Sequence, residues 1–190
     1  MRHTPITVQF RRQRLGKTNY GRRIAQLKSK LQRLFVKVSL NNIDIQIIEY
    51  QPDGDKVIMS ASSRELLKMG WKGHRGNTSA AYLTGLILAK KAKGKITQSI
   101  ILSSGKPSLT AQCATYAAAA GAIDGGLKLI IDKEVLPSTD RIHGKHIADL
   151  AKKMHGKPEY DKQFGGYKKR GLDPQKLPEH VQELIKKIKG

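Results

Sequence analysis

Three short segments between residues 34 and 62 have the pattern of β-strands, and they constrain the fold more than any other feature of the chain. In the central run, IDIQIIEYQ at 43–51, Ile43, Ile45 and Ile47 alternate with Asp44, Gln46 and Ile48, so an extended segment has one apolar face and one mixed face. An Asn-Asn pair precedes this run and Pro-Asp-Gly-Asp follows it, and both are typical of tight turns. The segments 34–39, 43–51 and 56–62 therefore predict a three-stranded antiparallel meander.

After the meander, helix and strand signals alternate. Ser62 and Glu65 have the spacing of a capping box before a short helix, which Gly70 is expected to end. Further elements are predicted at 77–92 (helix), 96–102 (strand), 109–124 (an Ala-rich helix) and 127–131 (strand), with a loop at 103–108. This order predicts an α/β fold in which helices flank a mixed sheet.

The C-terminal residues 178–188 predict one more helix. Pro178 suits a first helical turn, and the helix has an apolar stripe, made of Val181, Leu184, Ile185 and Ile188. Either the body of the protein or a neighbouring molecule must cover that stripe, and we expect the body. The chain is expected to divide into a basic arm (1–30), a globular domain (31–152) and a C-terminal extension (153–190).

Charge narrows the possible functions. The chain has 36 Lys and Arg against 15 Asp and Glu, a formal net charge of +21, and the first 37 residues contain eleven of these cations and no acid. Such a field attracts polyanions, and nucleic acid is the leading candidate. The sequence has neither an apolar run long enough to span a membrane nor the apolar core of a signal peptide, so we expect a cytoplasmic protein.

The N-terminal arm interleaves Phe10 and Tyr20 with arginines and lysines. It has too few apolar residues to bury a core, so it is expected to become ordered on binding a partner. Arginines can grip phosphates while the two rings stack on unpaired bases. A helical stripe of Ile24, Leu27 and Leu31 is predicted to dock on the body. The Gly-Lys-Thr at 16–18 is not a phosphate loop, because Arg11 stands where that motif needs glycine.

The segment GWKGHRGNT at 70–78 combines glycines with hydrogen-bond donors and precedes a helix. This pattern suits close approach to phosphates. Trp71 either packs in the core, which we favour, or stacks on a base. His74 is either partly protonated beside a phosphate or an exposed loop residue without a role.

Several motifs together carry a family resemblance: GKTNY, QIIEYQPDGDK, GWKGHRGNTSAAYLTG and LPSTDRIHGKHIADLA. In order and spacing they resemble the archaeal large-subunit ribosomal protein eighteen family, whose eukaryotic counterpart is large-subunit protein five. The similarity extends from about residue 9 to residue 151. The sequence departs from the family pattern at Gln32, at the turn 40–42, and at Arg75 and Ser79.

The resemblance implies a ribonuclease-H-like topology and a ribosomal protein without catalytic activity, cofactor, metal or self-association. Its expected role is to bind 5S rRNA with the arm and one face of the body, and to help attach it to 23S rRNA in the central protuberance. Other large-subunit ribosomal proteins, including the large-subunit protein five family, are its expected neighbours.

The residues expected to contact RNA come from three segments. They are inferred either from charge or from the resemblance. They are Arg11, Arg12, Arg14, Lys17, Thr18, Asn19, Tyr20, Arg22 and Arg23 in the arm; Trp71, Lys72, His74, Arg75 and Asn77 in the segment 70–78; and Arg141 and His143 in the motif DRIHGKH.

Two other functions were considered. A nuclease would need converging carboxylates, but Asp44 and Glu49 fall on opposite faces of their strand, and Asp53 and Asp55 lie in a turn. The pair His143 and His146 lacks a third ligand at useful spacing, and the single cysteine, Cys113, is expected to pack. The second alternative is a polyanion binder that does not recognise RNA shape, and sequence alone leaves it open.

Overall fold

The structure is a computed structural model that describes residues 7–105 and 109–190. A five-stranded mixed sheet forms its centre, with strand order β3-β2-β1-β4-β5. Strands β1, β2 and β3 are antiparallel neighbours, whereas β4 runs parallel to β1 and β5 parallel to β4. The strands are β1 (Gln32–Val38), β2 (Ile43–Glu49), β3 (Lys56–Ser62), β4 (Ile100–Ser104) and β5 (Leu129–Ile130). This sheet confirms the predicted meander and agrees with the expected ribonuclease-H-like topology.

The meander forms as its alternation predicts. Ile43, Ile45 and Ile47 are fully buried on one face of β2, and Leu34 of β1 pairs with Ile47 on the same face. Asp44 and Gln46 lie on the other face and are half-buried. The sheet therefore has one apolar face and one face of mixed polar and apolar residues, here called the open face.

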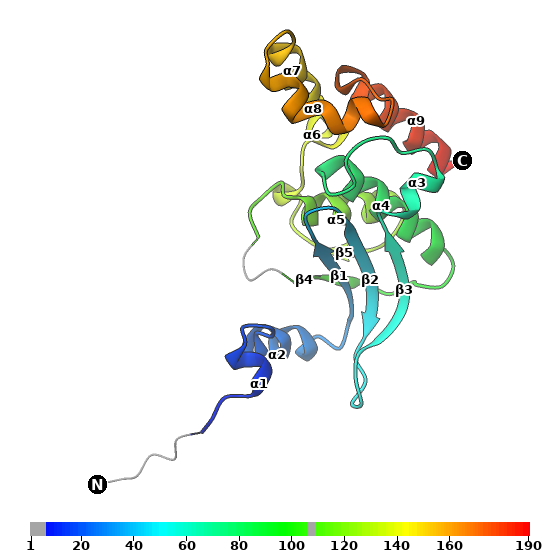
Figure 1. Ribbon diagram of the computed structural model, residues 1–190. Helices are drawn as coiled ribbons and strands as arrows, with labels where there is room; N and C mark the ends of the chain where they lie inside the picture. The colour runs from blue at the N-terminus through cyan, green and yellow to red at the C-terminus, as the bar shows by residue number, and fades with distance from the viewer. Residues whose placement is uncertain (1–6, 106–108) are drawn as a thin grey trace.

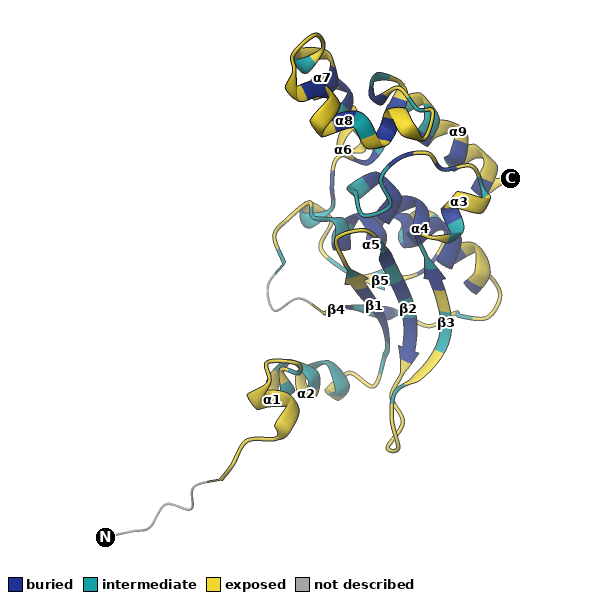
Figure 2. Ribbon diagram, viewed as in Figure 1, coloured by how far each residue is buried: buried dark blue, intermediate teal, exposed yellow. Residues whose placement is uncertain are grey.

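Two long helices cover the apolar face (Figures 1 and 2). They are α4 (Thr78–Ala92) and α5 (Ala114–Asp124). The side chain of Asn77 caps α4 by accepting a hydrogen bond from the Ala80 amide, 2.8 Å away. The helices approach so closely that a Cβ on Gly85 or Gly121 would overlap backbone atoms of the opposite helix. Glycine at these two positions is what allows the contact.

Short α3 (Glu65–Lys68) precedes α4. The Glu65 carboxylate accepts a hydrogen bond from the Ser62 amide, as a capping box predicts. In a capping box the Ser62 hydroxyl would in turn accept a hydrogen bond from the Glu65 amide. Here it accepts one from the Arg64 amide and donates one to the Asp44 carboxylate.

The rest of the chain is helical: η1 (Lys133–Val135), α6 (Thr139–His143), α7 (Lys145–Met154), α8 (Glu159–Lys169), η2 (Pro174–Lys176) and α9 (Leu177–Lys189). Helix α9 packs on α4, α6 and α7. Val181, Leu184 and Ile188 are at most 3 % exposed, so the body covers the apolar stripe as expected. Helix α7 runs across the boundary expected between residues 152 and 153.

Several predicted boundaries were wrong, and β5 is shorter than expected, at Leu129–Ile130 instead of 127–131. Strand β4 begins at Ile100 instead of residue 96, because its pairing with β1 starts at Gln32 and Ile100. Helix α5 begins at Ala114 instead of residue 109, since Gln112 has a left-handed backbone (φ 58°) and its amide bonds to the Val135 carbonyl. Ser103 and Ser104, expected in a loop, belong to β4, while residues 106–108 of that loop lie outside the described residues.

Candidate nucleic-acid interface

The described part of the arm, residues 7–30, folds into two helices against the sheet, α1 (Arg11–Arg14) and α2 (Tyr20–Lys28). The Arg12 Nε donates to the Thr18 hydroxyl at 2.9 Å, and the Asn19 side chain caps α2 by accepting from the Arg22 amide. None of residues 7–30 is buried, in agreement with the expected lack of a core. Thr18 and Asn19 thus shape the arm, in which Arg11, Arg12, Arg14 and Lys17 are exposed while Arg22 and Arg23 are half-buried.

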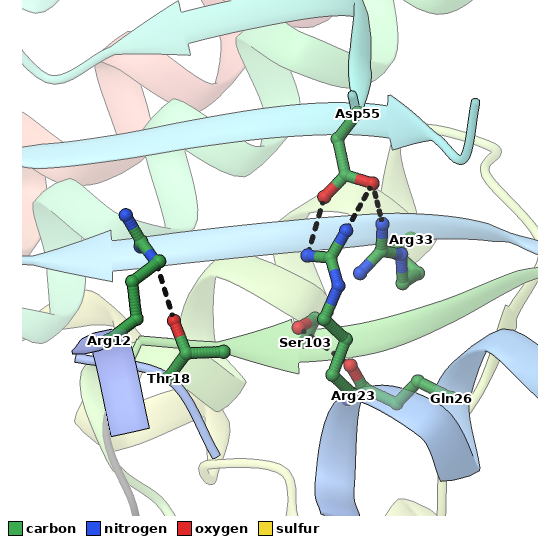
Figure 3. Close-up of polar contacts among 7 residues, drawn as sticks. All are labelled: Arg12, Thr18, Arg23, Gln26, Arg33, Asp55 and Ser103. Carbon is green, nitrogen blue, oxygen red and sulfur yellow. Dashed lines mark hydrogen bonds and ion pairs between the residues drawn. The ribbon is translucent and has the colours of Figure 1, made fainter. Parts of the chain in front are cut away.

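Polar side chains anchor α2 to the body. The Arg23 guanidinium makes two contacts with the Asp55 carboxylate, at 2.9 and 3.0 Å, and Arg33 from β1 reaches the same carboxylate at 2.7 Å (Figure 3). Gln26 donates to the Leu102 carbonyl and accepts from the Ser103 hydroxyl. Asp55, in the turn just before β3, therefore joins the arm to β1 through Arg33.

The predicted docking stripe of this helix was wrong in two residues. Leu27 is half-buried, but Ile24 is 54 % exposed, and Leu31, although half-buried, lies beyond the end of α2 at Lys28. The reason is that Arg23 and Gln26 set the rotation of α2 by their polar contacts with the sheet. Phe10 and Tyr20, whose ring centroids are 5.2 Å apart, contact each other.

A groove of about 470 Å³, here called the arm groove, separates the arm from the open face of the sheet. Its described lining carries five cations and one carboxylate, Asp55, which is already paired with two arginines. The cations are Arg12, Lys17, Arg22, Arg23 and Arg33. The floor includes Phe35 and Gln46 of the sheet. The described lining thus has a clear excess of positive charge, and such an excess in a groove favours an anionic ligand.

Trp71, in the second predicted segment, is part of the core. Its side chain is 2 % exposed and stacks on His180 of α9, with ring centroids 5.4 Å apart. The indole N–H donates to the His74 carbonyl at 3.3 Å, and Gly73 lies so close that a Cβ would overlap the ring. The structure therefore supports core packing for Trp71. The alternative, that this ring stacks on an RNA base, does not agree with its burial.

The neighbouring cations form a second basic surface, here called the loop surface and made of Lys72, Arg75 and Arg170. Burial, reinforced by the positive charges of Arg170 and Arg75, lowers the pKa of His74 below its usual value of 6.5. Its Nδ1 accepts a hydrogen bond from the Gly76 amide at 3.1 Å. His74 is thus a neutral acceptor that shapes the loop at pH 7, and the partly protonated form is not favoured in the free protein.

Among the other residues expected to contact RNA, Asn77 and Arg141 make hydrogen bonds within the protein. The Asn77 side chain caps α4. Arg141 on α6 is exposed, and its Nε donates to the Gln112 carbonyl at 3.3 Å. His143, the last residue of α6, is half-buried. Arg11 and Arg14 are exposed on α1, outside the groove lining.

Sequence reasoning missed Phe35, Gln46 and Arg170. The first two were open to prediction, since alternation places them opposite the apolar positions of β1 and β2. Arg170 gave no local signal, because it approaches His74 only through the packing of the C-terminal helices.

The fold and its charge define a strongly basic α/β protein whose cations gather on two surfaces. A family model described as "Ribosomal large subunit proteins 60S L5, and 50S L18" matches residues 5–106, more than half of the chain. The chain belongs to this family of large-subunit ribosomal proteins. Residues 107–190 lie outside the match, so the resemblance noted there, up to residue 151, stays a prediction.

Every helix in the described parts of the chain is too short or too polar to cross a lipid bilayer.

Proposed function

We propose that this ribosomal protein binds 5S rRNA through the arm groove and the loop surface, and thereby helps attach 5S rRNA to 23S rRNA in the central protuberance. The observation that carries the proposal is the arm groove, whose described lining has five cations and one carboxylate, Asp55, which pairs with Arg23 and Arg33. Arginine and lysine in such a groove suit an RNA backbone.

The arm groove and the loop surface lie on different parts of the fold. The arm groove lies between residues 12–23 and the open face of the sheet, whereas the loop surface lies beside α9 and the end of α8. Because they are separate, one RNA can engage both surfaces, or two RNA segments can engage one surface each. Either arrangement is compatible with a protein that attaches one RNA to another. Neighbouring large-subunit proteins, including the large-subunit protein five family, are proposed to complete the assembly on the ribosome in the cytoplasm.

The proposed role includes no catalysis. Among the carboxylates considered for a nuclease, Asp55 is neutralised by two arginines and Asp44 accepts a hydrogen bond from the Ser62 hydroxyl. These contacts occupy groups that a two-metal mechanism would need free for metal ions. We expect 5S rRNA to stay intact when incubated with the protein and Mg²⁺; cleavage that Asp44→Ala abolished would restore the nuclease alternative.

The test of RNA recognition is competition between 5S rRNA and folded transfer RNA from about 50 to 200 mM salt, a range over which ~6–10 phosphate contacts cost ~10³–10⁵ in affinity. We expect roughly a hundredfold preference for 5S rRNA to survive at the higher salt. If both affinities fall together, the protein is a polyanion binder that does not recognise RNA shape.

Two variants test whether the arm groove is part of the RNA-binding surface. Lys17→Ala removes an exposed groove cation and should reduce the salt slope by about one unit. Lys93→Ala is the matched control, because Lys93 is exposed after α4 and lies outside the groove lining. Equal slopes for the two variants would remove the groove from the binding surface.

A further inference from the structure

We infer that the arm groove holds one unpaired nucleotide of the bound RNA, with its base stacked on Phe35 and its phosphate held by Arg12 and Lys17. This inference rests on the proposed RNA-binding function and adds a ligand subsite to it. It predicts that the bound RNA places a bulged or looped-out base at this position.

Phe35 is the aromatic floor of the groove. In β1 it pairs with Gln46 of β2 on one side and with Ser103 of β4 on the other, near the middle of the open face. Its ring is half-buried, and Gly105 lies beside it, where even a Cβ would be 3.5 Å from the ring. Exposed aromatic rings on a sheet are a common platform for unpaired RNA bases, because every base has a flat face.

Gln46 supplies a group that can read the edge of such a base. Its side-chain amide has no hydrogen-bond partner among the described residues, although Gln46 lies directly beside Phe35. The Ser103 hydroxyl, on the other side of the ring, already donates to Gln26. An amide offers both a donor and an acceptor, so it can pair with the Watson–Crick or Hoogsteen edge of a stacked base.

The arm supplies the phosphate contacts. Arg12 and Lys17 line the groove from the arm side, opposite the sheet. Arg12 donates only its Nε to Thr18 among the described contacts, so its terminal N–H groups can bind a phosphate oxygen in bidentate fashion. Arg23 and Arg33 are held by Asp55 and keep the arm at this distance from the sheet.

The size of the groove selects a single strand. Its volume, about 470 Å³, falls within the range of sites that enclose small organic ligands. One nucleotide can enter with its base against the sheet. A duplex carries its phosphates on the outside and its bases in pairs, so it can reach the cationic rim but cannot reach Phe35.

The experiment uses fluorescence of the full chain. The wild-type protein has one tryptophan, Trp71, which is buried in the core and therefore cannot stack on a base. In the Phe35→Trp variant, a second tryptophan lies in the groove, and stacking on a base quenches its emission. We expect 5S rRNA to quench Phe35→Trp strongly and the wild type little. Equal quenching of the two proteins would overturn the inference.

Affinity provides the second measurement. Phe35→Leu should weaken 5S rRNA binding by about 5- to 100-fold, the range for losing one stacked base, while the salt slope stays unchanged because no phosphate contact is lost. Phe35→Trp should retain affinity, and Gln46→Ala should weaken it less than Phe35→Leu. Melting curves of each free variant establish that it is folded.

The outcomes separate this inference from the proposed function. If the wild type prefers 5S rRNA and Lys17→Ala lowers the slope, but Phe35→Leu binds as tightly as wild type, the groove binds phosphate alone and the inference fails while the function stands. If the wild type shows no preference for 5S rRNA over transfer RNA, the proposed function fails, and the inferred subsite fails with it.

Discussion

Arg23 in α2 and Asp55, just before β3, form a two-point ion pair, 32 residues apart in the chain, with nitrogen–oxygen distances of 2.9 and 3.0 Å. Arg33 shares the same carboxylate. The side chain of Asp55 is 21 % exposed and that of Arg33 only 4 %, so this contact is partly shielded from solvent. One carboxylate therefore fixes the position of the basic arm over the sheet.

Asp55→Asn should release the arm and destabilise the body. The change leaves the buried Arg33 without its counter-ion, and losing one partner of a buried pair costs roughly 3–5 kcal/mol. We expect a loss at the low end of that range, about 3 kcal/mol, because Asp55 is partly exposed. Urea unfolding measures the stability, and hydrogen exchange of α2 measures the release of the arm.

Asp53→Asn is the control for this prediction. Asp53 is an exposed aspartate in the same turn, and its change should have little effect. If the two variants unfolded at the same urea concentration, the ion pair would not be what holds the arm.

Gly121→Ala should destabilise the protein strongly. The added methyl would overlap the Tyr82 carbonyl where α5 crosses α4, so the helices must separate. Overpacking of this kind costs about 1–3 kcal/mol. Gly165→Ala in α8 is the control, because its Cβ would meet nothing within 4 Å and alanine favours a helix. Urea unfolding should therefore separate the two variants by more than 1 kcal/mol, and equal stabilities would contradict the close packing.

Stability should fall between pH 7.5 and 5.5. Burial lowers the pKa of His74, His146 and His180 below their ordinary value of 6.5. In the unfolded chain these histidines take up protons as the pH drops through 6.5, whereas in the folded state they resist protonation until lower pH. The unfolded state then binds more protons, so acid favours it.

The measurement is the free energy of unfolding of wild type and of His74→Gln/His180→Gln at each pH. The variant should show a shallower decline over this window. For His180, the Glu183 carboxylate opposes the effect of burial and Lys72 reinforces it, so its contribution is expected to decrease when Lys72 is removed. A wild-type curve that stayed flat from pH 7.5 to 5.5 would refute the prediction.

The loop surface should contribute to RNA binding through both of its segments. Lys72→Ala in the loop and Arg170→Ala after α8 should each reduce the dependence of log affinity on log salt by about 0.7–0.9, the value for one phosphate contact. Lys93→Ala serves as the control of equal charge change. If Arg170→Ala had the same salt dependence of affinity as the wild type, the C-terminal extension would support the loop without contacting RNA.

Much of the fold could be predicted from local sequence. The alternation in residues 43–48 predicts that Ile43, Ile45 and Ile47 share one face of β2, as they do. Helix α4 begins after Asn77, its capping residue, where the sequence predicts it to begin. These features depend on residues within a few positions of one another. The basic arm is also local, because its charge is a property of composition.

The boundaries that failed depend on distant partners. Strand β4 begins where β1 offers it a hydrogen-bonding neighbour, and α5 begins where the contact between Gln112 and Val135 ends. Neither partner is adjacent in the sequence. Local propensity could therefore indicate that these elements exist but could not indicate where they begin.

The sequence by itself determined which residues are available for the proposed RNA binding, namely a cationic arm and a glycine-rich loop, since charge and turn chemistry are local properties. Only the tertiary structure decided how they are used. It buried Trp71 against His180, paired Arg23 with Asp55, and set the arm cations over Phe35. The physical reason is that burial and ion pairing depend on the distance between side chains in space, and that distance is created only when the sheet and its helices pack.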